Sequence, residues 1–441
     1  MTAGRTGLLV VGAALAGRAL LAADPPPARK PVVRDFLGVN GHTVQFRPDL
    51  YKPVCRLVRD YHPFDWDVGD DTSFTPPFPF ARNRVDWGKV YGSWKDVGYD
   101  ADVCLMFDQV PAKQWKDLPK DAYAYGKAFA AAFGPSARRP LVTSAEIGNE
   151  PGGYDDPTYR TLFEHMAKEL RDGDPKLKVV TCAADAGKSG KYHKGLACVK
   201  GLEKLYDVVN VHTYAEAEGY PTWRRSYPED PKIPYLTRVK DAAAGRDANA
   251  PGKELWVTEF GWDASTKPAP KTGTFSKWVG STEAQQAQYL VRSVLVFAAL
   301  PVDRAYVFFF NDKDEPQIHG SSGLTRNYEP KPAYHALAHL QTVLGEYRFA
   351  RVVEERAGEL FVYEFAHGAD PAKRVWAAWS PTGSGRQAEV TLPVTAGAVA
   401  RAERMPLKPG PAEEVAWSAS GPDRIKVTVG EAPIYVRLKA R

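Results

Sequence analysis

The chain has 441 residues, a length that suits a barrel with a smaller attached module rather than one minimal domain. Its formal net charge of +5 is mild, and no run of Lys and Arg indicates a nucleic-acid-binding surface. Aromatic residues make up 12% of the chain, which is enough to fill a large core. We therefore expect a globular protein without a nucleic-acid partner.

The segment 1–23 has the pattern of a secretory signal peptide. Arg5 supplies the positive flank, and the run from Leu8 to Ala16 has the length of a hydrophobic region. Cleavage after Ala16 or after Ala23 fits the small-residue rule, and we favour Ala23 although Arg18 interrupts that longer option. A short uncleaved anchor is the alternative. No later segment approaches the ~20 apolar residues of a spanning helix. We expect a secreted or periplasmic protein without membrane contact after cleavage.

The four cysteines allow three complete disulfide pairings. Export permits a disulfide, and Cys182 with Cys198 is the candidate pair. Cys55 and Cys104 lie in predicted strands, where buried free thiols are favoured. No Cys or His spacing resembles a zinc site, so no metal site is predicted.

Strand-like segments alternate with helical patterns from about Gly38 to Gly345, which favours a parallel sheet with crossover helices. Good helix formers separate the strands, as in Tyr159 to Arg171 and Thr282 to Leu300. Eight such units predict an α/β fold, the (β/α)8 barrel, which typically takes ~250 residues. The predicted strands lie at 36–39, 56–59, 101–106, 141–147, 178–181, 208–211, 255–258 and 305–309.

The sequence changes character after Gly345, where short strands lie between Gly and Pro turns. A last helix begins near Pro332, as Pro favours the first helical turn. We expect the barrel domain to cover 24–345 and a β-sandwich to cover 346–441. Because no flexible linker separates them, the sandwich should pack tightly on the barrel. Its predicted strands lie at 360–365, 375–379, 388–392, 425–429 and 434–438.

Two glutamates, each at the end of a predicted strand, are the strongest functional signal. Glu150 follows the fourth strand, in the segment Thr143 to Pro151, and Glu259 ends the seventh, in the segment Leu255 to Trp262. The strands of a parallel barrel bring their C-terminal ends to one mouth, where both carboxyl groups can converge. Two carboxyl groups that flank one bond are what glycoside hydrolysis requires.

The motif Asn149-Glu150-Pro151, followed by an aromatic-flanked Glu259, resembles the motifs of clan A glycoside hydrolases, which are retaining enzymes. The layout is most similar to the β-xylosidase and α-L-iduronidase family and to related cellulase-like and glucuronidase families. The resemblance implies that Glu150 is the general acid/base and Glu259 the nucleophile, with carboxyl groups ~5–5.5 Å apart. It also implies an oligosaccharide or polysaccharide substrate and no metal or organic cofactor. We expect a monomer.

Four further residues are predicted to bind the sugar or to tune the carboxylates. The resemblance implies that Asn149 contacts the sugar 2-hydroxyl and that Tyr214 donates to the nucleophile. His212 lies two residues before Tyr214, so both share one face if the strand runs that far. Arg59 is expected to add positive charge near the nucleophile, with Arg56 as the alternative because the strand register is open.

One segment departs from the clan pattern. Clan members commonly carry a Trp at the end of the eighth strand, where it forms the floor of the sugar subsite, whereas this chain has Phe308 to Asp312 there. A Phe can still stack on a sugar, and other aromatic residues can supply a platform. The candidate substrate contacts are His62, Trp66, Trp262, Phe310 and Asn311.

Two other classes of protein stay open. A barrel that has lost turnover would be a carbohydrate-binding protein, and the missing Trp favours this alternative. A metal-dependent hydrolase is disfavoured because the chain has no His-rich ligand cluster, and sensitivity to EDTA would reveal one. Glu146 is a rival carboxylate for the site, and we expect it to have a structural role.

Overall fold

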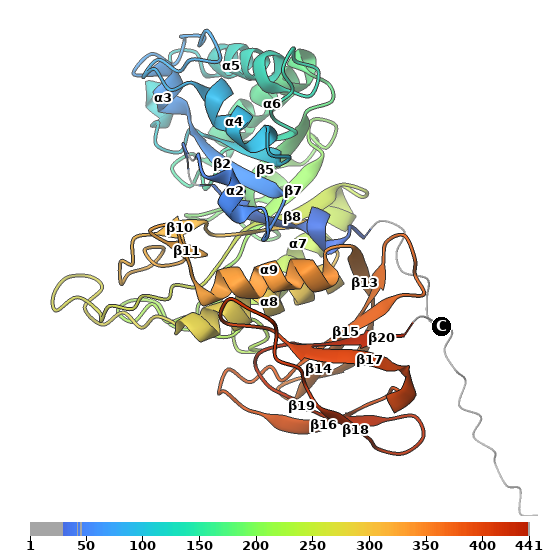
Figure 1. Ribbon diagram of the computed structural model, residues 1–441. Helices are drawn as coiled ribbons and strands as arrows, with labels where there is room; N and C mark the ends of the chain where they lie inside the picture. The colour runs from blue at the N-terminus through green and yellow to red at the C-terminus, as the bar shows by residue number, and fades with distance from the viewer. Residues whose placement is uncertain (1–29, 42, 45, 440–441) are drawn as a thin grey trace, which may run out of the picture.

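The computed structural model describes residues 30–41, 43–44 and 46–439. The predicted signal peptide lies outside these residues. In the part of the chain that is described, no helix is both long and apolar enough to span a membrane. A barrel domain, coloured blue to orange, carries a smaller β-domain in red (Figure 1).

Eight parallel strands close into a barrel, which confirms the predicted (β/α)8 fold. Their spatial order is β4-β3-β2-β1-β9-β8-β7-β5, and a pairing of β4 with β5 closes the ring. Parallel neighbours require a crossover between them, and the intervening helices supply it. The strands are β1 Leu37–Asn40, β2 Leu57–Pro63, β3 Asp100–Met106, β4 Ser144–Ile147, β5 Lys178–Asp185, β7 Val208–His212, β8 Glu254–Phe260 and β9 Arg304–Val307.

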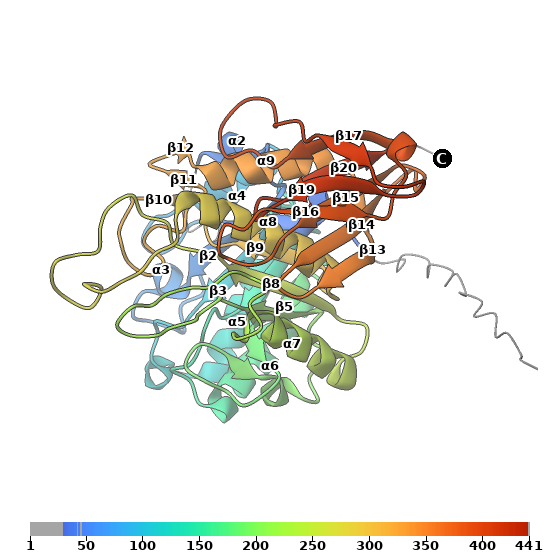
Figure 2. The ribbon, with the colours of Figure 1, turned by 90° about the horizontal axis from the view of Figure 1, so that it is seen from below.

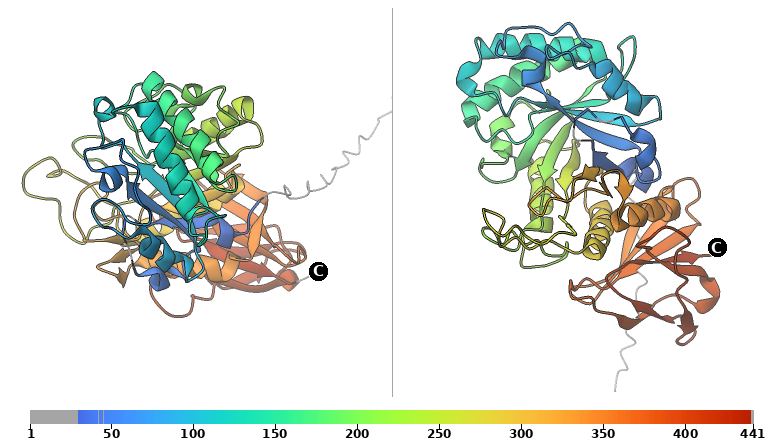
Figure 3. Two further views of the ribbon diagram at one scale, coloured as in Figure 1. Left: turned by 90° about the horizontal axis from the view of Figure 1, so that it is seen from above. Right: turned by 60° about the vertical axis from the view of Figure 1, so that its left-hand side comes forward.

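Helices cover the outside of the barrel, and α5 and α6 lie side by side there (Figures 1 and 3). The longer helices are α4 Trp87–Lys95, α5 Leu118–Phe133, α6 Asp156–Gly173, α7 Tyr235–Asn249, α8 Glu283–Ala299 and α9 Pro332–Leu344. The short elements are α1 Val33–Phe36, α2 Pro48–Tyr51, α3 Phe64–Val68, β6 Lys194–Gly195, β10 Asn311–Asp312, β11 Thr325–Arg326, β12 Glu329–Pro330 and the 3-10 helices Ala112–Gln114, Leu196–Val199 and Ala396–Ala398.

Local sequence sets where the long helices begin. Asp86, Asp117 and Asp155 each precede a helix and accept a hydrogen bond from a backbone N–H of its first turn. Thr282 and Gln285 form a reciprocal capping box at the start of α8. These caps satisfy N–H groups that have no partner inside the helix, and they fix the lengths of the loops that approach the barrel mouth.

The barrel interior is apolar at one end and polar toward the C-terminal ends of the strands. The apolar end is a cluster of Leu57, Val180, Val208, Trp256 and Tyr306. Gly38 makes room for it, because a Cβ at that position would lie 2.4 Å from the Tyr306 ring. Nearer the mouth the buried side chains are Asn40, Arg59, Glu146, Asn210 and Thr258.

The C-terminal domain is a sandwich of two antiparallel sheets, as predicted. Apolar side chains from both sheets, among them Val362, Trp376 and Val427, form one core between them. The five-stranded sheet has the order β13-β14-β15-β20-β17 and the three-stranded sheet the order β16-β19-β18. The strands are β13 Tyr347–Arg356, β14 Leu360–His367, β15 Arg374–Trp379, β16 Ala388–Leu392, β17 Val399–Arg404, β18 Trp417–Ala419, β19 Ile425–Val429 and β20 Ile434–Leu438.

The five-stranded sheet packs against α8 and α9 of the barrel (Figures 1 and 2). At this contact Arg292 of α8 is fully buried and forms ion pairs with Glu229 and Glu431. The indole of Trp379 also donates to Glu229, at 2.7 Å. A buried charge is tolerated only when it is paired, so this triad ties the sandwich to the loop between β7 and α7.

The predicted disulfide between Cys182 and Cys198 is wrong. All four cysteines lie in the described chain as buried free thiols, as was favoured for Cys55 and Cys104. The Cys182 thiol lies 3.4 Å from the carbonyl of Ala183, and the Cys198 thiol lies 3.3 Å from that of Asp156. Each thiol is therefore satisfied by a different carbonyl. Burial raises the pKa of Cys198 to about 11, which favours the unreactive protonated form.

Candidate active site

Glu150 and Glu259 meet at the C-terminal mouth of the barrel. Glu150 lies just after β4, and Glu259 lies near the end of β8. A carboxylate oxygen of each glutamate and a ring nitrogen of His212 all lie within 4.8 Å of one another. The two carboxyl groups are therefore close enough to flank one bond.

A turn after β4 aims Glu150 at the mouth. Gly148 adopts a φ of 85°, a conformation that side-chain-bearing residues rarely adopt, and a Cβ there would lie 2.8 Å from the Phe107 ring. Asp108 then fixes the turn, because its carboxylate accepts hydrogen bonds from the backbone N–H groups of Asn149 at 3.0 Å and Glu150 at 2.6 Å. Burial raises the pKa of Asp108 to about 6, although these hydrogen bonds oppose the shift.

A β-bulge orients Glu259. The register of β8 shifts against both neighbouring strands near Thr258 and Glu259. In a regular strand, successive side chains point to opposite faces, whereas a bulge can turn two neighbours to the same side. Here Thr258 bonds to Asn210 inside the barrel while Glu259 faces the mouth.

Three side chains donate hydrogen bonds to Glu259. Oε1 accepts from Arg59 Nη1 at 2.9 Å and from the Tyr61 hydroxyl, and Oε2 accepts from the Tyr214 hydroxyl at 2.8 Å. Burial raises the pKa of Glu259, but the nearby charges of His212 and Arg59 and the two tyrosine hydrogen bonds outweigh it and lower the pKa to about 2. Glu259 is therefore ionised at ordinary pH, as a carboxylate nucleophile must be.

Arg59 uses all five of its N–H donors on residues of the site. Nε and Nη2 bind the carboxylate of Glu146 at 3.0 and 2.6 Å, and Nη1 binds Asn40 Oδ1 at 2.8 Å in addition to Glu259. Nη2 also donates to Asn149 Oδ1 at 2.9 Å. A fully engaged guanidinium cannot rotate, so Arg59 fixes the positions of four acceptors at once.

The two glutamates differ in exposure. The side chain of Glu150 is 25% exposed, whereas that of Glu259 is 6% exposed. His212 lies between them, with Nδ1 at 3.0 Å from Glu150 and 3.7 Å from Glu259. Glu150 thus faces the solvent side of the mouth, and Glu259 is enclosed by donors.

Three rings, those of His319, Tyr214 and Phe308, border the same mouth. The ring of His319 lies 4.9 Å from that of Tyr214 and 5.0 Å from that of Phe308, both edge-on, and the His319 side chain is exposed. Arg225 covers the Tyr214 ring at 4.4 Å. His319 lies in a loop and was not predicted, because one His in a loop has no sequence signal. Asp108 was also missed, although it follows the end of β3.

The predicted contacts Phe310 and Asn311 do not face the two glutamates. Phe310 is 2% exposed and packs edge-on against Tyr51. Asn311 Oδ1 accepts hydrogen bonds from Thr325 and from the backbone of Tyr328, so its amide holds the loop. Phe308, just after β9, instead lies against Tyr214 and His319 at the mouth, so the prediction chose the wrong Phe of this run.

His62 is likewise turned away, because Arg59 and Tyr61 of β2 face inward and the residue after them faces outward. It is fully buried, and its two ring nitrogens bond to Tyr91 and Asp67. The side chain is therefore not available to a substrate, which corrects the prediction. The alternation also decides between Arg59 and Arg56 as the positive charge near Glu259. Arg59 faces the barrel interior, whereas Arg56, just before the strand, is exposed.

Neither Trp66 nor Trp262 supplies the predicted platform. Trp66 stacks on Trp87, whose indole donates to the buried Asp67. Trp262 is fully buried, packs against Tyr235 at 5.5 Å between ring centroids, and belongs to the core beneath the loops. Trp66 is half-buried in α3 and Trp262 is fully buried, so neither ring faces the two glutamates as a platform.

Glu150, His212 and Glu259 also have a spacing that can hold a metal ion. The donors around Glu259 argue against this use. The guanidinium of Arg59 lies 2.9 Å from Oε1, where it would repel a cation, and Tyr214 already donates to Oε2. The arrangement suits proton transfer and the stabilisation of negative charge.

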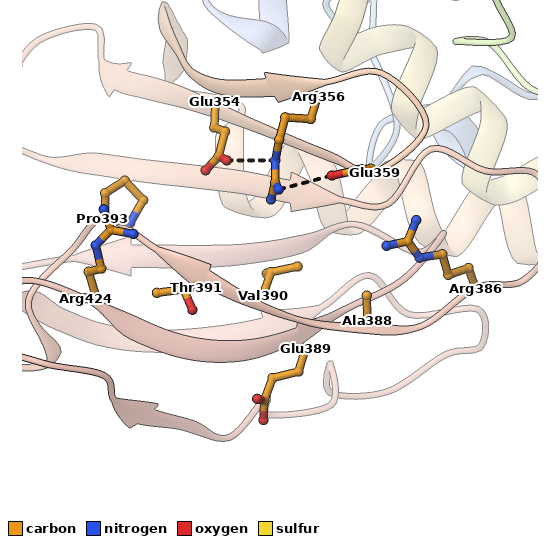
Figure 4. A pocket seen from close by; sticks show the side chains of 10 residues that line it. All are labelled: Glu354, Arg356, Glu359, Arg386, Ala388, Glu389, Val390, Thr391, Pro393 and Arg424. Atoms are coloured by element: carbon orange, nitrogen blue, oxygen red, sulfur yellow. Dashed lines mark ion pairs between the residues drawn. The ribbon is translucent and has the colours of Figure 1, made fainter.

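A separate hollow of about 590 Å³ lies in the sandwich, between β13 and β16 (Figure 4). On the β13 side of it, Arg356 forms ion pairs with Glu354 and Glu359. None of the described residues that line it is aromatic, and its charges neutralise one another. The chemistry needed at a reacting bond is therefore gathered at the barrel mouth.

No family model and no curated protein sequence matches this chain. Its fold is similar to solved glycoside hydrolases. A family 39 glycoside hydrolase from Bacteroides cellulosilyticus is 17% identical, with 93% of this chain and 82% of that chain covered at a TM-score of 0.67. A glucosidase from Croceicoccus marinus is 13% identical, with 95% and 97% covered at a TM-score of 0.64. A family 51 α-L-arabinofuranosidase from Bifidobacterium longum is 14% identical, with 95% and 98% covered at a TM-score of 0.60.

These similarities confirm the predicted resemblance to clan A at the level of fold. Each covers both the barrel and most of the rest of this chain. Identities this low carry the architecture and no more, because one barrel fold serves many chemistries. The function has to be argued from the residues at the mouth.

Proposed function

We propose that this protein is a secreted retaining glycoside hydrolase that cleaves O-glycosidic bonds by double displacement. The observation that carries the proposal is the pair of carboxyl groups within 4.8 Å, one ringed by donors and the other at the solvent side. Two carboxyl groups in such different surroundings are suited to an acid and a nucleophile. The fold shared with solved glycoside hydrolases supports the same class.

In the first step Glu150 donates its proton to the glycosidic oxygen while a carboxylate oxygen of Glu259 attacks the anomeric carbon. The bond from that carbon to the leaving oxygen breaks, and an ester between sugar and Glu259 forms. Arg59, Tyr61 and Tyr214 keep Glu259 ionised before the attack, as its lowered pKa indicates. They also hold the attacking oxygen in place.

In the second step Glu150, now a carboxylate, removes a proton from water. The hydroxide attacks the anomeric carbon, and the carboxylate of Glu259 leaves, so that the configuration is retained. Asn149 accepts from Arg59 through Oδ1, which turns its Nδ2 to the other side as a donor for the sugar 2-hydroxyl. That contact strengthens in the transition state and lowers the barrier of both steps.

The substrate is an oligosaccharide or polysaccharide. The protein acts as a monomer without a metal or organic cofactor. Export follows from the signal-like segment 1–23, and the mature chain then starts at Asp24. Expression in a secreting host tests the export directly, since the medium or periplasm should contain a protein whose N-terminal sequence begins with Asp-Pro-Pro.

Hydrolysis of a panel of aryl glycosides and polysaccharides tests the activity, with wild type beside Glu150→Ala and Glu259→Ala. We expect Glu259→Ala to lose turnover and azide to restore it with a glycosyl azide of inverted configuration. Sugar binding without turnover in the wild type would support a carbohydrate-binding protein instead. Loss of activity in EDTA would support a metal-dependent hydrolase.

A further inference from the structure

We propose that Thr258 and Asn210 are positioning residues that fix the tautomer of His212 and thereby hold the catalytic proton on Glu150. This inference rests on the proposed function. A chain of hydrogen bonds runs from the barrel interior to the acid/base. Thr258 donates to Asn210 Oδ1, His212 Nε2 lies 3.1 Å from Thr258 Oγ1, and His212 Nδ1 lies 3.0 Å from Glu150 Oε1.

The direction of each hydrogen bond follows from the one before it. The Asn210 amide presents its oxygen to Thr258 and leaves its buried Nδ2 without a partner among the described residues. Because an amide oxygen can only accept, the single hydroxyl hydrogen of Thr258 points toward it. Thr258 Oγ1 can then only accept from His212, which places a hydrogen on Nε2. In either charge state of His212, the hydrogen on Nε2 leaves Nδ1 to share the remaining proton with Glu150 Oε1.

This arrangement stabilises the form of Glu150 that a general acid needs. In the opposite tautomer, Nδ1 would carry the hydrogen and donate it to the carboxylate of Glu150, which would favour loss of the proton before the leaving oxygen receives it. The bulge in β8 makes the arrangement possible, because it turns Thr258 inward next to the inward Glu259. Asn210 and Thr258 are fully buried, so water does not compete for these hydrogen bonds.

The charges around His212 come from several elements. Glu150 after β4 and Glu259 on β8 are anionic neighbours, Arg59 on β2 is a cationic one, and His319 lies in the loop after β9. Burial lowers the pKa of His212, but the two carboxylates outweigh burial and raise it. The raised pKa means that His212 and Glu150 hold one proton between them, at the 3.0 Å contact of Nδ1 with Oε1.

The test compares Thr258→Val, which keeps the shape and removes the hydroxyl, with Thr258→Ser, which keeps the hydroxyl. The phenol of a phenyl glycoside needs a proton from the general acid to leave. The dinitrophenolate of a dinitrophenyl glycoside leaves without one. For Thr258→Val we expect kcat/KM on the phenyl glycoside to fall roughly tenfold or more, and the alkaline limb of its pH profile to move down by about one unit. Thr258→Ser should restore both, and the dinitrophenyl glycoside should change less than about twofold.

An unchanged alkaline limb in Thr258→Val, or an equal loss on both glycosides, would overturn the relay and leave the glycosidase proposal intact. A wild type inert on both glycosides would overturn both proposals. If Thr258→Val fails to fold, nitrogen NMR of the wild type decides, with His212→Asn to assign the signal. A hydrogen on Nε2 of His212 supports the relay, whereas a neutral His212 with its hydrogen on Nδ1 alone would mean that the Asn210 amide is turned and the relay is wrong.

Discussion

The guanidinium of Arg59 binds Glu259 through Nη1 at 2.9 Å and Glu146 through Nη2 at 2.6 Å, so one buried cation joins the mouth of the barrel to the carboxylate beneath it. Glu146 is fully buried, and burial with Asp102 beside it raises its pKa, which Arg59 opposes. Arg59 therefore stabilises the fold and at the same time keeps the nucleophile charged.

Replacing Arg59 by Ala should reduce both activity and stability. The loss of a preorganised donor to the nucleophile should lower kcat by roughly a hundredfold or more. The loss of the buried pair between Arg59 and Glu146 should lower the free energy of unfolding by about 3 kcal/mol. Steady-state kinetics and denaturant unfolding measure the two effects. Arg56→Ala, at an exposed position just before the same strand, is the matched control and should change neither. Equal behaviour of the two variants would contradict the account.

The lowered pKa of Glu259 predicts a pH dependence of stability. The folded protein holds this proton less tightly, with a pKa of about 2 against 4.5 for an unperturbed Glu, so ionised Glu259 stabilises the fold above about pH 4.5. That stabilisation is lost as the pH falls toward about 2. Between these values wild type should lose about 3 kcal/mol more than Glu259→Gln, as urea unfolding would show.

A surface substitution controls for general acid effects on this measurement. Glu413 is 71% exposed in the sandwich, and Glu413→Gln should follow the wild-type curve. Parallel curves for wild type and Glu259→Gln would show that the donors around Glu259 do not lower its pKa.

His319 is exposed at the mouth between Tyr214 and Phe308, so we expect it to contact the bound sugar. His319→Ala should raise KM roughly fivefold, which corresponds to about 1 kcal/mol of lost binding, while kcat changes less than about twofold. His335→Ala on α9 is the control, because that side chain lies outside the barrel mouth. A fall in kcat at constant KM would assign His319 to the chemical steps instead.

Arg292 should be essential to the attachment of the sandwich. Arg292→Met leaves Glu229 and Glu431 as buried, unpaired carboxylates, and we expect it to lower the free energy of unfolding by about 3–5 kcal/mol. Arg424→Ala, at an exposed position of the sandwich, should stay within about 0.5 kcal/mol of wild type. If Arg292→Met unfolds like wild type, the contact between the domains does not depend on this triad.

The barrel and the two glutamates could be predicted because they depend on local patterns. Alternation of apolar strands with helix formers predicts crossovers, and strand ends in a barrel share one mouth. Whether Arg59 or Arg56 faces the barrel interior depends on which side chains of β2 point inward. The pairing of β2 with both neighbouring strands sets this, and the sequence alone does not. The same pairing turns His62 outward, whereas the place of Phe308 at the mouth depends on the path of the chain after β9.

Two features of the site have no local signal at all. The bulge that turns Thr258 and Glu259 to the same side arises from pairing with both neighbouring strands, which sequence periodicity does not encode. Asp108 and His319 reach the mouth from loops whose paths depend on long-range packing. The candidate disulfide between Cys182 and Cys198 rested only on the expected export of the protein. Each thiol instead lies against a different backbone carbonyl.

The most direct measurement is to trap the covalent intermediate with a 2-deoxy-2-fluoro glycoside of the sugar that the hydrolysis panel identifies. Peptide mass spectrometry should find one sugar ester on Glu259, and product analysis should find retained configuration. An ester on Glu146 or Glu150, or a first product of inverted configuration, would contradict the assignment of Glu259 as the nucleophile.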